Sequence, residues 1–213
     1  MKLAEIGKWK GFFDKFTVFR TVLIQEHYIN EILKNTKKGD SLLEIASGSG
    51  YTSLVLLYSG RDNVTASDIE DELLEDIEEK MPELMVEKVD AFDMPYGDGS
   101  IDCIFHQGFL EHFSDEDIIK LLNESARVGK KVIFDIPNAR RWDKTKEYGD
   151  ERFMYHRRWK KLIGKSNLRI IKDTGRRMPK SFKYLPKFMS ENNWFRKHFG
   201  TSSIFVCAPK VNG

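Results

Sequence analysis

The chain contains 213 residues, with 35 Lys and Arg, 33 Asp and Glu, and a formal net charge of +2. A composition of 40% hydrophobic and 12% aromatic residues is ordinary for a globular protein and excludes a disordered chain. The purely apolar runs are only a few residues long, which excludes a transmembrane helix, and the length is typical of a single domain.

Two helices are expected ahead of the first strand. The aromatic residues of segment 1–16 lie among lysines and predict a short amphipathic helix. This helix can pack against the domain or form a lid over a substrate pocket. From Val18 to Leu33 the apolar residues follow helical spacing, and Gly39 suits the left-handed conformation that often ends a helix.

Strands and helices then alternate along the chain. Seven strands are predicted, at Ser41 to Ala46, Asn63 to Ser67, Leu84 to Val89, Ser100 to His106, Lys130 to Ile136, Leu168 to Thr174 and Ser202 to Ala208. Further helices are predicted at Tyr51 to Ser59, Asp71 to Lys80, Ser114 to Gly129, Tyr155 to Lys165 and Lys187 to His198. A long polar loop from Ala139 to Arg152 interrupts the alternation, and loops of this length in compact domains are often functional.

This alternation predicts an α/β fold, a Rossmann-like three-layer sandwich around a mostly parallel seven-stranded sheet with an antiparallel last strand. We expect one domain over residues 1–213. Within it, residues 1–37 form N-terminal helices that can act as a lid, residues 38–136 form a cofactor-binding core, and residues 137–213 supply acceptor-side loops and the last two strands. A ligand is expected at the carboxyl ends of the strands, where the strand order reverses.

The small net charge hides two charged segments. Asp68 to Glu83 carries nine acids and one base, which is typical of the solvated side of one helix. Arg152 to Lys187 carries thirteen bases and one acid, with aromatic residues between them. The basic segment can be a solvated face or can meet an anionic partner.

The two cysteines, Cys103 and Cys207, both lie in apolar, strand-like runs and are expected to be reduced core residues. No spacing of Cys and His residues resembles a metal site, so none is predicted. The first ten residues carry four charges and lack the apolar core of a signal peptide. We therefore expect a cytoplasmic protein without integral membrane association.

The stretch Leu42-Leu43-Glu44-Ile45-Ala46-Ser47-Gly48-Ser49-Gly50 combines an apolar strand with a glycine turn that opens a helix. Glycine leaves the backbone open to a ligand, and a helix start offers free N–H groups and a positive dipole end. Asp68 closes the second strand, where an acid can accept two ribose hydroxyls. This order of features indicates a nucleotide-like ligand, although a glycine turn can be only a turn and Asp68 only a helix cap.

Four segments in this order resemble the class I S-adenosylmethionine-dependent methyltransferases, well over about residues 38–136 and loosely beyond. They are the loop from Glu44 to Gly50, Ser67-Asp68-Ile69, Val89-Asp90-Ala91-Phe92, and the run from Asp102 to Phe113. The resemblance implies a methyltransferase with S-adenosylmethionine as cofactor and S-adenosylhomocysteine as product. A dinucleotide-binding domain is the competing interpretation, but its fingerprint needs a third small residue at the position of Ser53, which serine matches poorly.

The resemblance also implies a role for each matching position. Glu44, Ala46, Ser47, Gly48 and Gly50 would lie along the methionyl part of the cofactor. Ala46 departs from the family pattern, because the family usually has a glycine there. The remaining implied contacts are Asp68 with the ribose, Ile69, Asp90, Ala91 and Phe92 with the adenine, and Gln107 and Gly108 beside the sulfonium.

The acceptor side is less determined. If the acceptor is a hydroxyl it needs a base, and His112 and His156 are the candidates, although a structural histidine at the start of a helix is the more ordinary interpretation of His112. Candidate acceptor contacts are Phe13, Phe16, Asn138, Trp142 and Tyr155. We expect a small-molecule acceptor, with the basic segment favouring an anionic one. The alternatives are a nucleic-acid methyltransferase and a cofactor-binding protein without turnover. Neither the acceptor atom nor the oligomeric state follows from the sequence.

Overall fold

The computed structural model describes residues 18–139, 151–175 and 192–211. Its helices are α2 (Val18–Asn35), α3 (Tyr51–Tyr58), α4 (Asp71–Lys80), the 3-10 helix η1 (Leu110–His112), α5 (Asp115–Val128), α6 (His156–Lys165) and α8 (Asn193–Phe199). Its strands are β1 (Leu42–Glu44), β2 (Val64–Asp68), β3 (Met85–Lys88), β4 (Cys103–Gln107), β5 (Val132–Pro137), β6 (Leu168–Gly175) and β7 (Ser202–Pro209).

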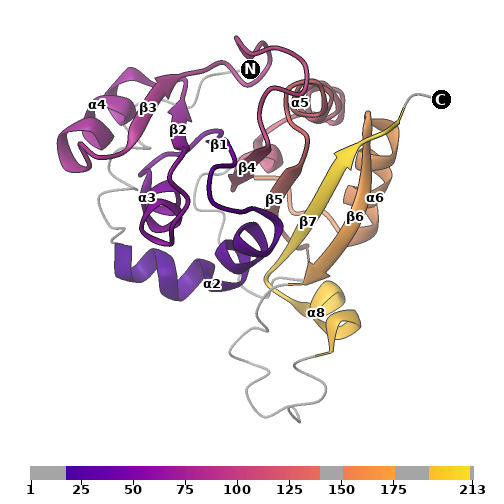
Figure 1. Cartoon of the computed structure of the whole chain (residues 1–213). Helices are drawn as coiled ribbons and strands as arrows, with labels where there is room; N and C mark the ends of the chain where they lie inside the picture. The colour runs from indigo at the N-terminus through magenta and orange to yellow at the C-terminus, as the bar shows by residue number, and fades with distance from the viewer. Residues whose placement is uncertain (1–17, 140–150, 176–191, 212–213) are drawn as a thin grey trace.

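The strands form one seven-stranded sheet in the order β3-β2-β1-β4-β5-β7-β6 (Figure 1). The first five strands pair in parallel, and β7 pairs antiparallel with both β5 and β6. The predicted fold class is therefore confirmed, including the antiparallel last strand. Strand order reverses beside β1, so the carboxyl ends of β1 and β4 flank the switch point of the sheet.

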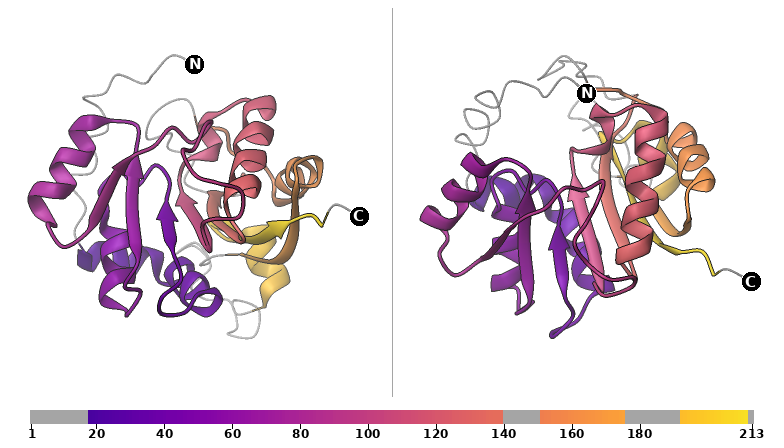
Figure 2. Two further views of the ribbon diagram at one scale, coloured as in Figure 1. Left: turned by 45° about the horizontal axis from the view of Figure 1, so that its top comes forward. Right: turned by 90° about the horizontal axis from the view of Figure 1, so that it is seen from above.

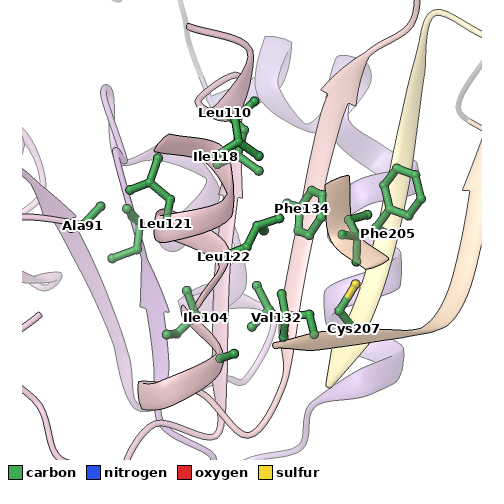
Figure 3. Close-up of a cluster of buried hydrophobic side chains, with 14 of the residues drawn as sticks. Ala91, Ile104, Leu110, Ile118, Leu121, Leu122, Val132, Phe134, Phe205 and Cys207 are labelled. Atoms are coloured by element: carbon green, nitrogen blue, oxygen red, sulfur yellow. The ribbon is translucent and has the colours of Figure 1, made fainter. Parts of the chain in front are cut away.

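Helices cover both faces of the sheet (Figure 2). One large cluster packs α5 and α6 on the face that carries Ile104, Phe134 and Phe205. A second cluster packs α2 and α3 on the opposite face, against Phe105, Ile133 and Ile204. Figure 3 shows part of the first cluster, with α5 side chains against those of β4, β5 and β7. Cys103 and Cys207 are both free and buried in these clusters, as the sequence predicts.

The predicted boundaries need small corrections. β1 has three residues rather than the six predicted, because Ala46 leaves the extended region with a φ of 52°. β4 begins at Cys103 rather than Ser100, since the Asp102 N–H donates to the Ser41 hydroxyl at 3.0 Å instead of to a neighbouring strand. Helix α8 begins at Asn193, where Asn192 caps it by accepting two N–H groups, and the predicted helix start at Lys187 lies outside the described residues. The helix predicted over residues 1–16 lies outside the described residues.

The first turn of α5 shows why the start of this helix is predictable from the sequence. The Ser114 hydroxyl accepts the N–H of Asp117 at 3.1 Å, which satisfies one of the unpaired donors of the first turn. Ile118, Leu121 and Leu122 then recur at helical spacing and are buried against the sheet.

The contact between β6 and α8 leaves no room for a side chain at Gly175. A Cβ built there would lie 1.9 Å from the Arg196 carbonyl carbon, so Gly175→Ala must displace backbone. We expect it to lower the free energy of unfolding by about 3 kcal/mol, at the upper end of overpacking costs. Gly164→Ala in α6 is the matched control, because nothing lies within 4 Å of that Cβ. It should raise stability by about 0.5–1 kcal/mol. Urea unfolding measures both, and equal stabilities would contradict this packing.

Candidate functional site

The glycine loop joins β1 to α3 at the carboxyl edge of the sheet. The Ser47 N–H donates to the Ser67 carbonyl at 2.9 Å, and the Gly50 N–H donates to the Ser47 carbonyl at 3.0 Å. Gly50 has a φ of 68°, and a Cβ there would lie 3.1 Å from the Ile77 side chain. Both the backbone angle and the close approach of α4 therefore require glycine at this position.

Ala46 occupies a backbone conformation that favours glycine. Its φ of 52° is the only positive value found for a non-glycine among the described residues. The alanine that departs from the family pattern is therefore held in a strained backbone conformation.

The Glu44 carboxylate is buried beneath the loop. Its Oε2 accepts the Ser53 N–H at 3.1 Å and the Ser53 hydroxyl at 2.6 Å, which satisfies a donor in the first turn of α3. Burial raises the pKa of Glu44 to about 7, against the opposing effect of these hydrogen bonds. Through Ser53, Glu44 stabilises the start of α3. The role of Glu44 at the methionyl end of the cofactor stays a prediction.

Asp68 connects the end of β2 to the loop. Its Oδ2 accepts the Gly48 N–H at 3.1 Å, and its Oδ1 accepts the N–H groups of Ile69 at 2.8 Å and Glu70 at 3.3 Å. The side chain is 7% exposed, and burial raises its pKa. The acid predicted to hold a ribose is therefore in place beside the glycine loop, and it also holds that loop.

Two apolar side chains beyond Asp68 remain exposed. Ile69 is 46% exposed and Phe92 is 37% exposed, whereas Ala91 between the strands is buried. The Asp90 carboxylate accepts the Phe92 N–H at 2.9 Å, so it forms the turn in which Phe92 lies. Exposed apolar groups at the edge of a ligand-sized site are typical contacts for an aromatic ring.

The end of β4 carries a polar pair. The Gln107 amide nitrogen donates to Asp135 Oδ2 at 2.9 Å, and the Gly108 N–H donates to the Asp135 carbonyl at 3.3 Å. Two other polar atoms near the loop, Gln107 Oε1 and Ser47 Oγ, are buried and have no hydrogen-bond partner among the described residues. Buried atoms of this kind are expected to meet a ligand or water.

The two candidate bases differ in their surroundings. His156 uses both ring nitrogens, one with the Ser203 hydroxyl at 2.9 Å and the other with Asp173 Oδ2 at 2.8 Å. Burial lowers its pKa, and its ring stacks on Phe205. His156 therefore ties α6 to β6 and β7 and is a poor candidate base. His112 ends η1, close in sequence to Gln107.

The residues predicted to contact the acceptor lie only partly within the described ranges. The Asn138 amide nitrogen donates to the Lys197 carbonyl at 2.8 Å, which fixes the end of β5 to α8. Tyr155 is 60% exposed directly before α6. Phe13, Phe16 and Trp142 lie outside the described residues.

Several bases of the basic segment already have acidic partners. Arg152 and Arg158 both pair with Asp115. Lys160 pairs with Asp173 at 3.5 Å and Lys172 with Glu31 at 2.6 Å. Pairing of these charges inside the protein reduces what they can offer to an anionic ligand.

Sequence reasoning missed the buried acid Asp135, which is 1% exposed within β5. A signal was present, since an acid interrupts the apolar run Val132-Ile133-Phe134-Asp135-Ile136. Within residues 18–139, 151–175 and 192–211, no group of three or more His, Cys, Asp or Glu side chains is arranged to hold a metal ion. In the same ranges no helix is long and apolar enough to cross a membrane.

Comparison with known proteins places this geometry in a class. Residues 42–131 match the family model described as a methyltransferase domain. No curated protein sequence matches significantly. Among solved structures, a putative methyltransferase of Haloferax volcanii, in complex with the Trm112 methyltransferase activator, is similar with a TM-score of 0.70 and 14% identity. That match covers 94% of this chain and 97% of the other.

Two more solved structures share the fold. An S-adenosylmethionine-dependent methyltransferase of Aquifex aeolicus has a TM-score of 0.65 and 18% identity, covering 96% of this chain and 97% of its own. A methyltransferase of Thermotoga maritima, named a possible histamine N-methyltransferase, has a TM-score of 0.67 and 16% identity, covering 96% and 99%. At these identities the structures establish the fold, and the family model identifies residues 42–131 as similar to a methyltransferase domain.

Residues 42–131 therefore match a methyltransferase domain, and this match agrees with the resemblance to class I S-adenosylmethionine-dependent methyltransferases. This class implies S-adenosylmethionine as the cofactor. The residues present fit that group, since an acid ends β2, exposed apolar side chains follow β2 and β3, and the buried Ser47 hydroxyl is unpaired among the described residues.

Replacing Ala46 by glycine should stabilise the protein. Glycine adopts a φ of 52° without the steric cost that alanine incurs, so Ala46→Gly should raise the free energy of unfolding by about 1 kcal/mol. For a chain of this size the melting temperature should rise by roughly 2–4 °C. Ala126→Gly within α5 is the opposite control and should destabilise. A loss of stability in Ala46→Gly would show that the loop is not strained at this position.

Glu44 should make stability depend on pH. Its folded-state pKa of about 7 lies above the ordinary value of 4.5, so the folded state binds more protons between these values. The free energy of unfolding should then fall as the pH rises from 4.5 to 7, by an amount on the order of 3 kcal/mol. Glu44→Gln should remove this contribution, and Glu83→Gln, at an exposed site, should retain it. Denaturant titrations across this range test it, and equal slopes in Glu44→Gln and the unchanged protein would contradict it.

Proposed function

We propose that the protein transfers a methyl group from S-adenosylmethionine to a small-molecule acceptor. The observation that supports this most is the placement of the glycine loop, of Asp68 with the exposed Ile69, and of the exposed Phe92 after the carboxyl ends of the neighbouring parallel strands β1, β2 and β3. These groups suit the methionyl, ribose and adenine parts of one ligand.

Asp68 has capacity left for a ribose hydroxyl. A carboxylate offers about four acceptor positions, and three are used by the N–H groups of Gly48, Ile69 and Glu70. A hydroxyl donating to the fourth would make a charge-assisted hydrogen bond. Ile69 and Phe92 would then enclose the adenine, while the Asp90 turn holds Phe92 in position.

The bound cofactor supplies an electrophilic methyl group on its sulfonium. The protein's task is to hold the acceptor in line with that methyl and to exclude water, since positioning removes much of the entropic barrier. We expect the glycine loop to lie on the donor side of this arrangement and Gln107, at the end of β4, to lie between the donor and the acceptor. An acceptor hydroxyl would pass its proton to a base, for which His112 is the candidate, whereas an unprotonated amine needs positioning alone.

The ion pairs of the basic segment favour a small molecule over a nucleic acid. A nucleic-acid acceptor needs a continuous cationic face, and four described bases of this segment are engaged with Asp115, Asp173 and Glu31. The same pairs weaken the argument for an anionic acceptor, which stays a prediction. We expect the loops and strands after residue 136 to line the acceptor site.

Removing the charge of Asp68 should weaken cofactor binding. Asp68→Asn keeps the shape of the side chain but loses charge-assisted acceptance, so the Kd for S-adenosylhomocysteine should rise by about tenfold or more. Calorimetric titration measures it, with Asp62→Asn on the protein surface as the matched control. Tight binding of NAD or NADP in place of S-adenosylhomocysteine would overturn the proposed cofactor.

Phe92 provides an independent test of adenine binding. Stacking of a base on an aromatic ring contributes about 1–3 kcal/mol, so Phe92→Ala should raise the Kd for S-adenosylhomocysteine roughly tenfold or more. Tyr58→Ala, which removes another exposed aromatic ring, should leave the Kd unchanged. Turnover with a labelled methyl donor separates an enzyme from a protein that only binds the cofactor. Steep loss of acceptor binding with salt would instead favour a nucleic acid.

A further inference from the structure

A group of polar side chains lies on the α2 face of the sheet, beyond the apolar cluster under that helix. Phe105, Ile133 and Ile204 belong to the cluster on β4, β5 and β7. Because strand side chains alternate, Gln107, Asp135 and Ser202, each two residues away, share that face at the carboxyl edge of β4 and β5. On this face of the sheet, the side chains therefore change from apolar to polar at the carboxyl edge, where the site is expected.

The strand pairing brings these residues together. Gln107 is the register partner of Asp135, and its amide nitrogen donates to the Asp135 carboxylate at 2.9 Å. On β7, Ile204 is the register partner of Asp135. Ser202 pairs with Pro137, two residues closer to the carboxyl end of β5. Gln107, Asp135 and Ser202 therefore lie on three neighbouring strands.

Thr21 reaches the same region from α2. The Lys131 ammonium donates to the Asn35 carbonyl, and the Tyr28 hydroxyl donates to the Ile133 carbonyl, so α2 runs antiparallel along β5. Thr21 is two turns before Tyr28 on the same buried stripe, about 10.5 Å further along the helix. At about 3.3 Å per strand residue, that distance takes Thr21 about three residues past Ile133, to the carboxyl end of β5 that carries Asp135. We call Thr21, Gln107, Asp135 and Ser202 the α2-face polar cluster.

Three atoms of this cluster have no hydrogen-bond partner in the described part of the chain. They are Thr21 Oγ1, Gln107 Oε1 and Ser202 Oγ. Thr21 is 1% exposed and Ser202 is 7% exposed, so water does not reach these hydroxyls freely. Burial of unpaired polar atoms costs free energy, and three of them around one buried carboxylate indicate a polar ligand.

The cluster lies beside the cofactor groups rather than over them. Neighbouring strands are about 4.8 Å apart, so Asp135 on β5 is roughly 10 Å from β1, and Ser202 on β7 is roughly 14 Å away. The adenine and ribose contacts lie on the other side of β1, at β2 and β3. The cluster is therefore on the side that an acceptor would occupy.

We propose that the α2-face polar cluster binds a protonated amine of the acceptor, with the Asp135 carboxylate as its counter-ion. This proposal rests on the proposed methyl transfer and names the acceptor class for it. An ammonium group has three donors and no acceptor, and Asp135 and Gln107 Oε1 offer acceptors only. The two hydroxyls can turn their oxygens towards the same donors. A carboxylate acceptor would instead face the like charge of Asp135 in a buried site.

Matched ligands test the charge of the acceptor directly. Phenethylammonium, 2-phenylethanol and 3-phenylpropionate share one skeleton and differ only at the end group, and ethylammonium, ethanol and propionate repeat the series for a smaller site. With saturating S-adenosylhomocysteine, at least one ammonium should bind roughly tenfold to a hundredfold more tightly than its carboxylate. Equal binding, tighter carboxylate binding, or no ammonium binding at millimolar concentration would overturn the proposal.

Variants assign the preference to the cluster. Asp135→Asn keeps the side-chain shape and should lower ammonium affinity about tenfold or more, while Asp102→Asn at the opposite edge of the sheet should not. Thr21→Val and Ser202→Ala give two further variants in case Asp135→Asn fails to fold, and each should lower ammonium affinity. Unchanged ammonium affinity in all folded cluster variants would overturn the assignment. A loss of S-adenosylhomocysteine affinity equal to the loss for ammonium would also overturn it, by assigning the cluster to the cofactor.

The two proposals fail in different ways. Ammonium titrations are made with and without S-adenosylhomocysteine, and the latter is titrated alone first. Failure of S-adenosylhomocysteine to bind would overturn the methyl transfer, while ammonium binding to the free protein would still support the cluster as a cation site. Binding of S-adenosylhomocysteine with no preference for ammonium would overturn the acceptor class alone.

Discussion

The arrangement of the site depends on two buried carboxylates beneath one turn. Asp68 holds the Gly48 N–H from the end of β2, and Glu44 holds the Ser53 N–H from the end of β1. Each acid thereby stabilises a backbone that glycine and a strained Ala46 would otherwise leave mobile. Burial opposes ionisation of both groups, so the geometry of the loop is coupled to their charge.

The elements around β6 and β7 are organised by a different network. The Asp173 carboxylate, on β6, pairs with His156 and Lys160 of α6 and with Lys197 of α8, and so connects these three elements. Asn138 then ties the end of β5 to α8. These contacts place rigid elements beside the α2-face polar cluster, which suits an acceptor that must be held at a fixed angle to the donor. Lysines that the sequence alone leaves available to an anionic ligand are thereby paired with an acid of the same chain.

Much of the fold was predictable because local signals agreed with it. α4 has the predicted bounds Asp71–Lys80, and α5 begins at the predicted Ser114 cap. The ends of the strands were less predictable. β1 ends just before Ala46, whose φ is positive, and β4 begins just after Asp102, which is hydrogen-bonded to Ser41. Both events depend on contacts between residues distant in sequence. Among the site residues, the sequence placed Asp68, Ile69 and Phe92 at strand ends but said nothing of their exposure.

The sequence alone determined the class of the protein, because a glycine turn, an acid after the second strand and the alternation of elements are local patterns read in order. Only the tertiary structure decided what individual charged and polar groups do. It made His156 a tie between elements rather than a candidate base, paired Arg152 with Asp115, and buried Asp135 beside Gln107. The reason is physical: burial and the partner of a side chain are set by strand register and helix packing, which join residues more than twenty positions apart.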